Sequence, residues 1–365
     1  MKKITTAGAI LFMTTSIATA GGLDRSGQGI GVIFEDGDYA ELSFGSVTPS
    51  VSGVGFSGAF APGTPTGNVT PSYIQLGMAF RTQVNEQVSL AVIYDQPFGA
   101  DVDYGTGSTY ILATTNAQVE SDGVTALVRY EINPTFSVHG GMRYIQANGV
   151  YDRAFFPDVD DTGPLTAIPA YASTYSTGGG VGYVVGGAYE REDIALRVAL
   201  TYSSEIDLEL DGTAGNLSTT LPESVNLDFQ TGIAADTLVF GSVRYVAWDG
   251  FSLDDDNPLS GGSILSYDDD VYTYNIGIGR RLSDQFAVSF SVGYEASTGD
   301  PSGNLGPTDG FISYQVGGAY TMDNGIEVSG GVRYINIGDT TTEVVAGDFS
   351  DNDAVAVGLK VAYNF

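Results

Sequence analysis

The last residues of the chain alternate strictly between large apolar side chains and small or polar ones. The apolar set is Val355, Val357, Leu359, Val361, Tyr363 and Phe365. Residues two apart point to the same face of a β-strand, so this segment predicts a strand with one apolar face. The alternation recurs at 136–144 and 194–202. One such strand fits either a soluble sandwich or a transmembrane barrel, because both need strands of this kind.

The lengths of the connections separate these two folds. The pattern predicts fourteen strands, near residues 39–48, 70–81, 87–97, 117–132, 136–146, 177–190, 194–205, 222–233, 237–248, 270–282, 286–296, 309–322, 326–337 and 353–365. Short turns at 133–135, 191–193, 234–236, 283–285 and 323–325 alternate with long loops near 49–69, 98–116, 147–176, 206–221, 249–269, 297–308 and 338–352. Single-chain outer-membrane barrels combine an even strand number with short periplasmic turns and long external loops. We therefore predict an all-β fold, a 14-stranded antiparallel transmembrane β-barrel over residues 39–365.

The N-terminus predicts export. Lys2 and Lys3 precede an apolar stretch at 7–18, and Ala18-Thr19-Ala20 has the small-x-small pattern that signal peptidase accepts. About 12 moderately apolar residues cannot span a hydrocarbon core of ~30 Å, so residues 1–20 are predicted to be a signal peptide rather than an anchor. No later stretch is apolar enough for a transmembrane helix, which leaves a closed barrel in the bacterial outer membrane.

The composition excludes several function classes. The chain has no cysteine, and therefore no disulfide, thiol nucleophile or cysteine-based metal site. Its 44 Asp and Glu against 14 Lys and Arg give a formal net charge of −30, which argues against nucleic-acid binding. The single histidine, His139, is expected on the lumen face near the periplasmic end, a poor place from which to hydrolyse an outer-leaflet lipid. We expect no enzyme, no cofactor and no bound metal.

Most of the basic residues are predicted on strands, on the face opposite the apolar one. They are Arg129, Arg143, Arg197, Arg244, Arg333 and Lys360. One interpretation is that they pair with inward carboxylates such as Glu41, Glu295 and Glu327 in a polar lumen. The other is that one or two arginines hold the carboxylate of a substrate, for which a planar guanidinium is suited. The sequence leaves both open.

The acidic residues concentrate in the predicted long loops. They are Asp158, Asp160, Asp161, Asp254, Asp255, Asp256, Asp268, Asp269, Asp270, Asp351 and Asp353. They predict a solvated external surface, with divalent cations bridging to lipopolysaccharide as the alternative. Glycines within strands, as at 178–180 and 186–187, predict bends or close approach of the backbone inside the barrel.

Four segments, taken in order along the chain, resemble the FadL/TodX family of outer-membrane transporters. They are Gly22–Gln28, Tyr94–Asp101, Leu221–Val225 and Arg244–Trp248. The resemblance implies a channel for long-chain fatty acids or aromatic hydrocarbons, plugged by an N-terminal hatch. It also implies an external apolar groove that captures substrate, and a kink in the third strand that opens the wall sideways.

The resemblance assigns residues to these parts. Pro97, Phe98 and Gly99 fall where the kink is implied, although Pro97 could instead simply end its strand, since proline cannot donate to a ladder. The hatch is assigned to residues 21–38, shorter than is typical, and is expected to begin below the barrel. The loop at 147–176 is a candidate groove, with Phe155 and Phe156 as contacts, and Trp248 joins the arginines as a substrate-binding candidate.

These expectations define a function. The protein should take up hydrophobic molecules passively, by lateral diffusion through the wall at the kink. The alternatives are a general diffusion porin and a structural or adhesive barrel. Expected partners are the hydrophobic molecules, outer-membrane lipids, lipopolysaccharide and the outer-membrane insertion machinery, for which the terminal Phe365 resembles the recognition signal.

Overall fold

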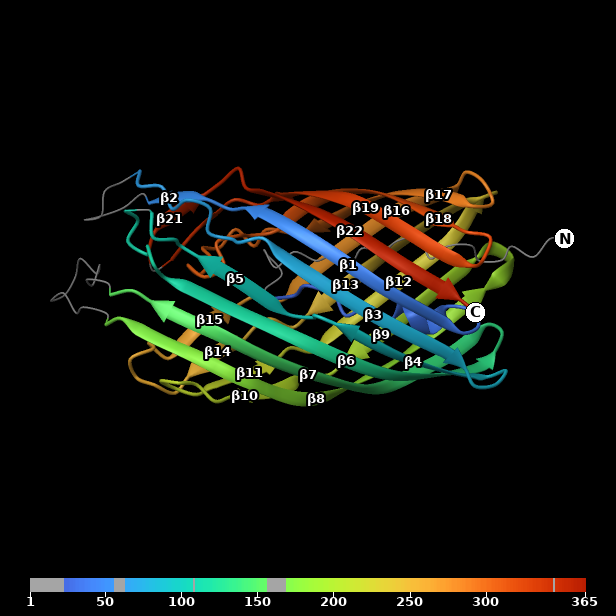
Figure 1. Cartoon of the computed structure of the whole chain (residues 1–365), viewed down its shortest axis with the longest axis horizontal. Helices are drawn as coiled ribbons and strands as arrows, with labels where there is room; N and C mark the ends of the chain where they lie inside the picture. The colour runs from blue at the N-terminus through green and yellow to red at the C-terminus, as the bar shows by residue number, and fades with distance from the viewer. Residues whose placement is uncertain (1–22, 56–62, 108, 156–168, 344) are drawn as a thin grey trace.

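Fourteen antiparallel strands close into a barrel in the computed structural model, which describes residues 23–55, 63–107, 109–155, 169–343 and 345–365 (Figure 1). The strands are β1 (Tyr39–Ser50), β3 (Tyr73–Gln83), β4 (Val88–Asp95), β6 (Asn116–Asn133), β7 (Phe136–Arg153), β8 (Tyr171–Arg191), β9 (Leu196–Ser203), β12 (Ser224–Ala234), β13 (Thr237–Val246), β16 (Val271–Arg281), β17 (Phe286–Glu295), β18 (Phe311–Thr321), β19 (Ile326–Ile337) and β22 (Asp353–Asn364). The first and last strands pair over their full length, from Tyr39 opposite Asn364 to Ser50 opposite Asp353. The predicted fold and strand number are confirmed.

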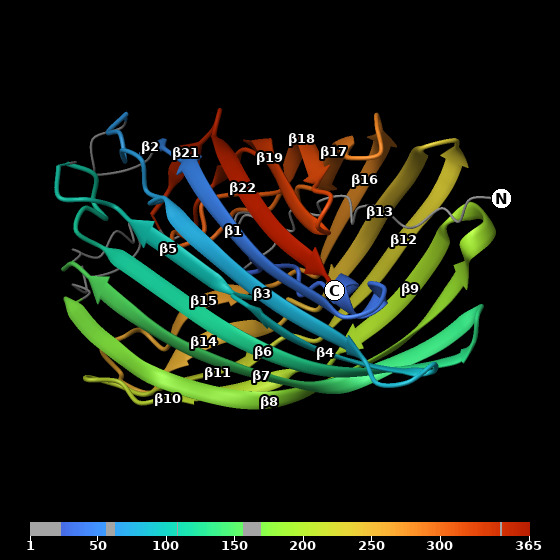
Figure 2. The same ribbon diagram turned by 45° about the vertical axis from the view of Figure 1, so that its right-hand side comes forward.

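The connections sort by length as predicted. Short turns and the C-terminus lie at one end of the barrel, and the long connections lie at the other (Figures 1 and 2). In outer-membrane barrels the short turns lie on the periplasmic side, so the end with the short turns is periplasmic. Among the described residues, no helix has the length and apolar character needed to cross a membrane. The predicted signal peptide at 1–20 lies outside the described residues.

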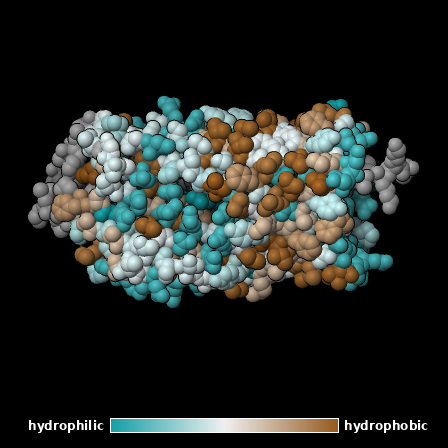
Figure 3. All heavy atoms as spheres, viewed as in Figure 1, coloured by the Kyte–Doolittle hydropathy of each residue, from teal (hydrophilic) through white to brown (hydrophobic). Residues whose placement is uncertain are grey.

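The outer face of the barrel carries an apolar band. Leu42, Met78 and Val92 are about half exposed, with 55%, 50% and 48% of their surface accessible. Such exposure would be costly in water but is stabilised by lipid. Two belts of outward tyrosines flank the band: Tyr144, Tyr183 and Tyr334 toward the long loops, and Tyr130, Tyr320 and Tyr363 toward the short turns. Figure 3 shows hydrophobic atoms gathered over the half with the short turns and hydrophilic atoms over the other half, so the barrel extends well beyond the membrane.

Four of the predicted long loops contain strands that form two further sheets, and the prediction of loop there is wrong. The strands β10 (Ile206–Leu210), β11 (Leu217–Leu221), β14 (Phe251–Asp255) and β15 (Ser263–Tyr267) form a separate four-stranded sheet. A smaller sheet joins β2 (Gly53–Gly55), β20 (Thr340–Thr341) and β21 (Gly347–Phe349). Ile206, Leu208 and Leu210 alternate with polar residues and belong to a buried cluster. The period of two that indicates a strand was therefore present in this predicted loop.

Glycines on β8 allow this four-stranded sheet to pack closely against the inner wall of the barrel. A Cβ at Gly178 would lie 2.1 Å from the carbonyl oxygen of Glu209, and one at Gly180 would lie 2.3 Å from that of Asp207. Both distances are far below van der Waals contact, so β10 can lie flat on β8 only because these side chains are missing. The predicted close approach inside the barrel is confirmed here.

The N-terminal segment from residue 23 lies inside the barrel, which corrects the expectation that it begins below it. A short 3₁₀ helix, η1 (Gly31–Phe34), ends the segment just before β1. Ile30, Val32, Ile33 and Phe34 are buried together with Ala79, Ala91, Leu127 and Val184, which line the lumen. The apolar residues of the segment explain this position, because they bury more surface in the lumen than they could below it.

Candidate functional site

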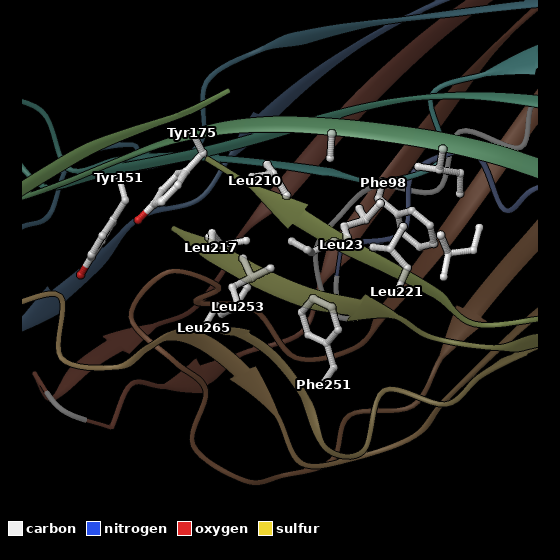
Figure 4. Packing of buried hydrophobic residues seen from close by; sticks show 14 of the residues in the cluster. Leu23, Phe98, Tyr151, Tyr175, Leu210, Leu217, Leu221, Phe251, Leu253 and Leu265 are labelled. Carbon is white, nitrogen blue, oxygen red and sulfur yellow. The ribbon is translucent and has the colours of Figure 1, made fainter. Parts of the chain in front are cut away.

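An apolar cavity lies in the external half of the lumen. Its free space is small, about 50 Å³, and its lining comes from three parts of the chain. Leu23 comes from the N-terminal segment, Phe98 and Val119 from the wall, and Leu208 and Leu253 from the four-stranded sheet. Figure 4 shows these side chains converging, with Leu23 and Phe98 in contact at one end and Tyr151 and Tyr175 at the other. This half of the lumen is a hydrophobic core, so the polar lumen suggested by the inward basic residues does not extend into it.

Trp248, a predicted substrate contact, packs behind the cavity rather than lining it. Its side chain is fully buried. Its ring meets those of Phe98, Phe251 and Tyr267 edge to face, with centroid distances of 6.0, 4.8 and 5.3 Å. These contacts fix the position of Phe98, which does line the cavity. Trp248 therefore supports the cavity wall.

Two of the predicted arginines tie the N-terminal segment to the wall beneath the cavity. Arg244 forms a buried ion pair with Asp24, and its Nη1 donates to Asn226 Oδ1 over 2.8 Å. Arg143 Nη1 donates to Gln28 Oε1 over 2.6 Å, and its Nε donates to Thr125 Oγ1 over 2.8 Å. These arginines face the lumen as predicted, but their donors are used to hold the segment in place.

A second, larger chamber lies between these arginine contacts and the periplasmic end, and its wall mixes charged with apolar side chains. Its free volume is about 860 Å³, and Glu35, Glu41, Arg197, Asp228 and Lys360 contribute to its lining. Lys360 Nζ lies 3.2 Å from Glu41 Oε2, which is the pairing with an inward carboxylate that the sequence suggested. Burial raises the pKa of Glu35, and the charges of Lys360 and Arg197 oppose this shift.

Phe34 of η1 is clamped at the edge of this chamber by two further predicted arginines. The guanidinium carbons of Arg129 and Arg197 lie 4.9 and 4.8 Å from the centroid of its ring. Arg129 also pairs with Glu131 over 3.4 Å and with Glu190. The ring of His139 meets Phe34 edge to face at 5.7 Å. These residues anchor the lower end of the N-terminal segment by cation–π contacts.

The remaining predicted residues lie away from the cavity. Arg333 donates to Ser313 Oγ over 2.8 Å and stacks on Phe311. Phe155 is 59% exposed at the external rim, and Phe156 lies outside the described residues. Of the predicted acidic loops, Asp158, Asp160 and Asp161 also lie outside the described residues.

One acidic residue departs from the expected solvated surface. Asp255 is buried and accepts hydrogen bonds from the hydroxyls of Tyr171, over 2.6 Å, and Tyr175. It therefore connects β14 of the four-stranded sheet to β8 of the barrel wall. In the described part of the chain, no group of three or more acidic or histidine side chains is arranged to hold a metal ion.

The third barrel strand breaks at the predicted position and resumes. β4 ends at Asp95 and β5 (Gly99–Asp103) follows, both pairing with β6. Asp95 lies opposite Gly123 and Gly99 opposite Glu120, so three residues face two across the break, which is a bulge. Pro97 is the middle one of the three and has no N–H to donate.

The break leaves a gap in the wall between β3 and β5. β3 pairs with β4 only from Met78 onward, and β5 pairs with no barrel strand except β6. The contacts at the gap include three from backbone donors: Leu76 N–H donates to Gln96 Oε1 over 2.9 Å, Gly99 N–H to the Leu23 carbonyl over 2.8 Å, and Asp103 N–H to the Val69 carbonyl over 2.8 Å. The middle contact comes from the N-terminal segment.

Two residues of this segment were not predicted as site residues. Leu23 lines the apolar cavity, and Arg25 lies in the gap, with its amide N–H donating to the Pro97 carbonyl over 2.8 Å. Both were within the motif Gly22–Gln28 on which the family resemblance rested. Periodicity gave no signal for them, because the segment belongs to no barrel strand.

With this geometry in view, the family can be stated. Residues 46–365 match the family model described as outer membrane protein transport protein (OMPP1/FadL/TodX). The chain belongs to the FadL/TodX family. Comparison with curated protein sequences gives no match.

Solved structures share the fold at low sequence identity. A Pseudomonas aeruginosa FadL homologue has a TM-score of 0.72 at 13% identity, with 91% of each chain covered. The Pseudomonas putida toluene transporter TodX has a TM-score of 0.63 at 11% identity, with 90% of each chain covered. The Ralstonia pickettii toluene transporter TbuX has 0.62 at 11%, covering 97% of this chain and 100% of that one.

Family membership fixes the general role of the barrel. The protein is an outer-membrane channel of the FadL/TodX type for hydrophobic compounds, which is a transporter family rather than an enzyme family. The predicted outer-membrane location agrees with the family and the transmembrane barrel.

Proposed function

We propose that the protein takes up hydrophobic molecules passively, captures them in the apolar cavity and releases them sideways through the gap between β3 and β5. The observation that carries this proposal is that Phe98 lines the cavity and also belongs to the broken strand. The cavity and the gap are therefore neighbours, joined at one residue.

Capture rests on burial of apolar surface. Each buried methylene group stabilises a bound chain by ~0.8 kcal/mol, so even part of an alkyl chain or an aromatic ring would bind well among these leucines. The free space of about 50 Å³ is small, and Leu23 therefore has to move when a substrate enters. Movement of Leu23 disturbs the hydrogen bond from Gly99 that closes the gap.

Lateral exit is favoured over passage down the lumen. A molecule that moves straight down must cross the buried ion pair of Arg244 with Asp24, and it then enters a chamber whose wall also carries charged side chains. A molecule that moves sideways meets Ile74 and Leu76 on the outer face of β3, which are 57% and 45% exposed toward the lipid. Lipid offers an apolar environment without charged groups.

The outer face also supports the expected partners. Phe365 is 57% exposed and its ring stacks on that of Tyr363 at 5.4 Å, within the lipid-facing row of β22. A terminal aromatic residue in this position suits recognition by the outer-membrane insertion machinery. The external acidic residues suit contact with lipopolysaccharide through divalent cations.

Growth tests the proposal directly. The gene is expressed in a bacterium that lacks its own fatty-acid channel, and growth is measured on oleate as sole carbon source, with uptake of an alkane and of toluene measured in parallel. We expect rescue on at least one of these compounds. Failure with all three, in cells where heat-modifiable mobility on gels shows correct insertion, would refute the transport function.

A conductance measurement in planar bilayers separates this function from a general porin. We expect little ion conductance, because the N-terminal segment fills the lumen between cavity and chamber. Conductance typical of a water-filled pore, together with no uptake of hydrophobic molecules, would favour a porin.

A further inference from the structure

The side chain of Arg25 passes through the gap between β3 and β5. Its guanidinium carbon lies 4.2 Å from the centroid of the Tyr73 ring on β3. On the other side, a Cβ built on Gly99 of β5 would lie 2.6 Å from the same carbon. Gly99 pairs with Glu120, which is exposed on the outer face, so the place of its missing side chain is on that face too. Arg25 therefore reaches from inside the barrel toward the membrane.

The charge of Arg25 is not neutralised by a direct partner. The residue is only 7% exposed, its Nε has no hydrogen-bond partner among the described residues, and it forms none of the ion pairs found there. Burial lowers its pKa, although Tyr73, Glu120 and Asp101 oppose this effect. Arg129 and Arg244, in contrast, each hold a carboxylate directly. A buried guanidinium without such a partner is suited to receive an anion.

The borders of the gap differ in chemistry. On the β3 side the outward residues are the apolar Ile74 and Leu76. On the β5 side they are acidic: Glu120 and Asp103 are exposed and Asp101 is half-buried. A carboxylate approaching this side would be repelled by three like charges, and Arg25 is the cation between them. The two borders together fit a molecule with an apolar chain and one carboxylate.

We propose that Arg25 binds the carboxylate of the transported molecule at the lateral gap, and thereby selects long-chain carboxylic acids over neutral hydrocarbons. This inference rests on the proposed function, since it names the substrate class that leaves through the gap. The chain lies along Ile74 and Leu76 while the carboxylate meets Arg25. Gly99 is the second determinant, because any larger residue there displaces the guanidinium.

Paired substrates test the inference in the full-length protein. Uptake of oleate and of oleyl alcohol, which has the same chain without the carboxylate, is measured in cells for the wild type, Arg25→Gln, Arg25→Lys and Gly99→Ala. For Arg25→Gln and Gly99→Ala, we expect oleate uptake to fall about tenfold, the size of one lost charge-assisted contact, and oleyl alcohol uptake to stay within about twofold. Arg25→Lys keeps the charge and should be intermediate for oleate.

Each other outcome has a defined meaning. An equal loss of both substrates in Arg25→Gln, with normal heat-modifiable mobility, would overturn the inference and leave Arg25 as a structural plug. Unchanged oleate uptake would overturn it as well. If the wild type takes up neither substrate, the proposed function itself fails. Arg191→Gln, at an exposed periplasmic turn where Arg191 pairs with Asp193, is the matched control and should change neither uptake.

Discussion

The two halves of the lumen differ in size and in the charged groups of their walls. The external half holds a narrow cavity of about 50 Å³ among leucines and aromatic rings, whereas the periplasmic half holds a chamber of about 860 Å³ with carboxylates and cations in its wall. The segment from Leu23 to Phe34 separates them. It contributes an apolar residue to the cavity, an ion pair to the boundary and a clamped phenylalanine to the chamber.

This difference indicates why the substrate does not travel the whole length of the barrel. A hydrophobic molecule is surrounded by apolar side chains in the upper half, whereas the buried ion pair at the boundary below cannot replace these apolar contacts. The seam between β1 and β22 is continuous, while the wall next to the cavity is interrupted between β3 and β5. The interruption lies on the side of the boundary where hydrophobic molecules are bound.

Removing the boundary should have the largest effect. Deletion of residues 23–34 joins cavity and chamber into one open lumen, while all fourteen barrel strands remain. We expect ion conductance in planar bilayers to rise at least about tenfold, since an unplugged barrel of this size is water-filled. Unchanged conductance of a correctly folded deletion variant would show that the two halves are not separated by this segment.

The second largest effect is expected when β4 and β5 are made into one continuous strand, which should close the exit. Deletion of Pro97 leaves two residues, Gln96 and Phe98, opposite two residues of β6. β4 and β5 can then pair with β6 as one regular strand, and Phe98 still points inward. We expect uptake to fall about tenfold with normal folding. Pro97→Ala keeps the extra residue and should reduce uptake less, without lowering the heat-modifiable folded fraction.

The control for this pair is Pro134→Ala, in the short turn between β6 and β7. It changes a proline without touching the gap and should leave uptake unchanged. If deletion of Pro97 also leaves uptake unchanged, the exit lies elsewhere.

Displacing the four-stranded sheet from β8 should weaken substrate binding by a smaller amount. A Cβ at Gly180 would lie 2.3 Å from the Asp207 carbonyl, so Gly180→Ala pushes β10 away from β8 and widens the cavity. Overpacking of this kind costs about 1–3 kcal/mol, and we expect the Kd for a fluorescent fatty acid to rise about tenfold. Gly187→Ala, on the same strand with its nearest atom at 3.3 Å, is the matched control. Equal affinities in both variants would argue against this role of Gly180.

The smallest expected effect concerns the chamber. Burial raises the pKa of Glu35 in the folded protein above its unfolded value, so the folded state binds the proton more tightly. The stabilisation is therefore fully present below the unfolded pKa and is lost as pH rises through the folded one. We expect the protection factors of the η1 amides, which are corrected for the intrinsic pH dependence of exchange, to be larger at pH 4 than at pH 8, and Glu35→Gln to remove this difference. A pH dependence that persists in Glu35→Gln would assign it to another group.

Local patterning predicted most of the barrel. Strands with one lipid-facing side follow a period of two that needs no tertiary information, and β22 shows it from Val355 to Tyr363. The strand break was implied by the family resemblance, whereas the missing donor of Pro97 alone left open whether the strand breaks or ends there. The same pattern in Ile206, Leu208 and Leu210 was taken for a loop, since alternation does not tell which of two sheets a strand joins.

The functional parts were harder to predict for a physical reason. The five inward arginines were recognisable, yet the two that hold the N-terminal segment have partners far along the chain: Arg244 meets Asp24, and Arg143 meets Gln28. No local rule links residues at such separations. Trp248 was likewise visible as an aromatic residue, but its place behind Phe98 depends on how the four-stranded sheet enters the barrel.

The sequence by itself determined the barrel and its outer-membrane location, because both follow from the period of two and from the alternation of short turns with long loops. Only the tertiary structure decided where the N-terminal segment lies, and with it the cavity, the boundary and the position of Arg25 between Tyr73 and Gly99. These features are made by side chains from distant segments, and their energies exist only once the closed barrel brings those segments together.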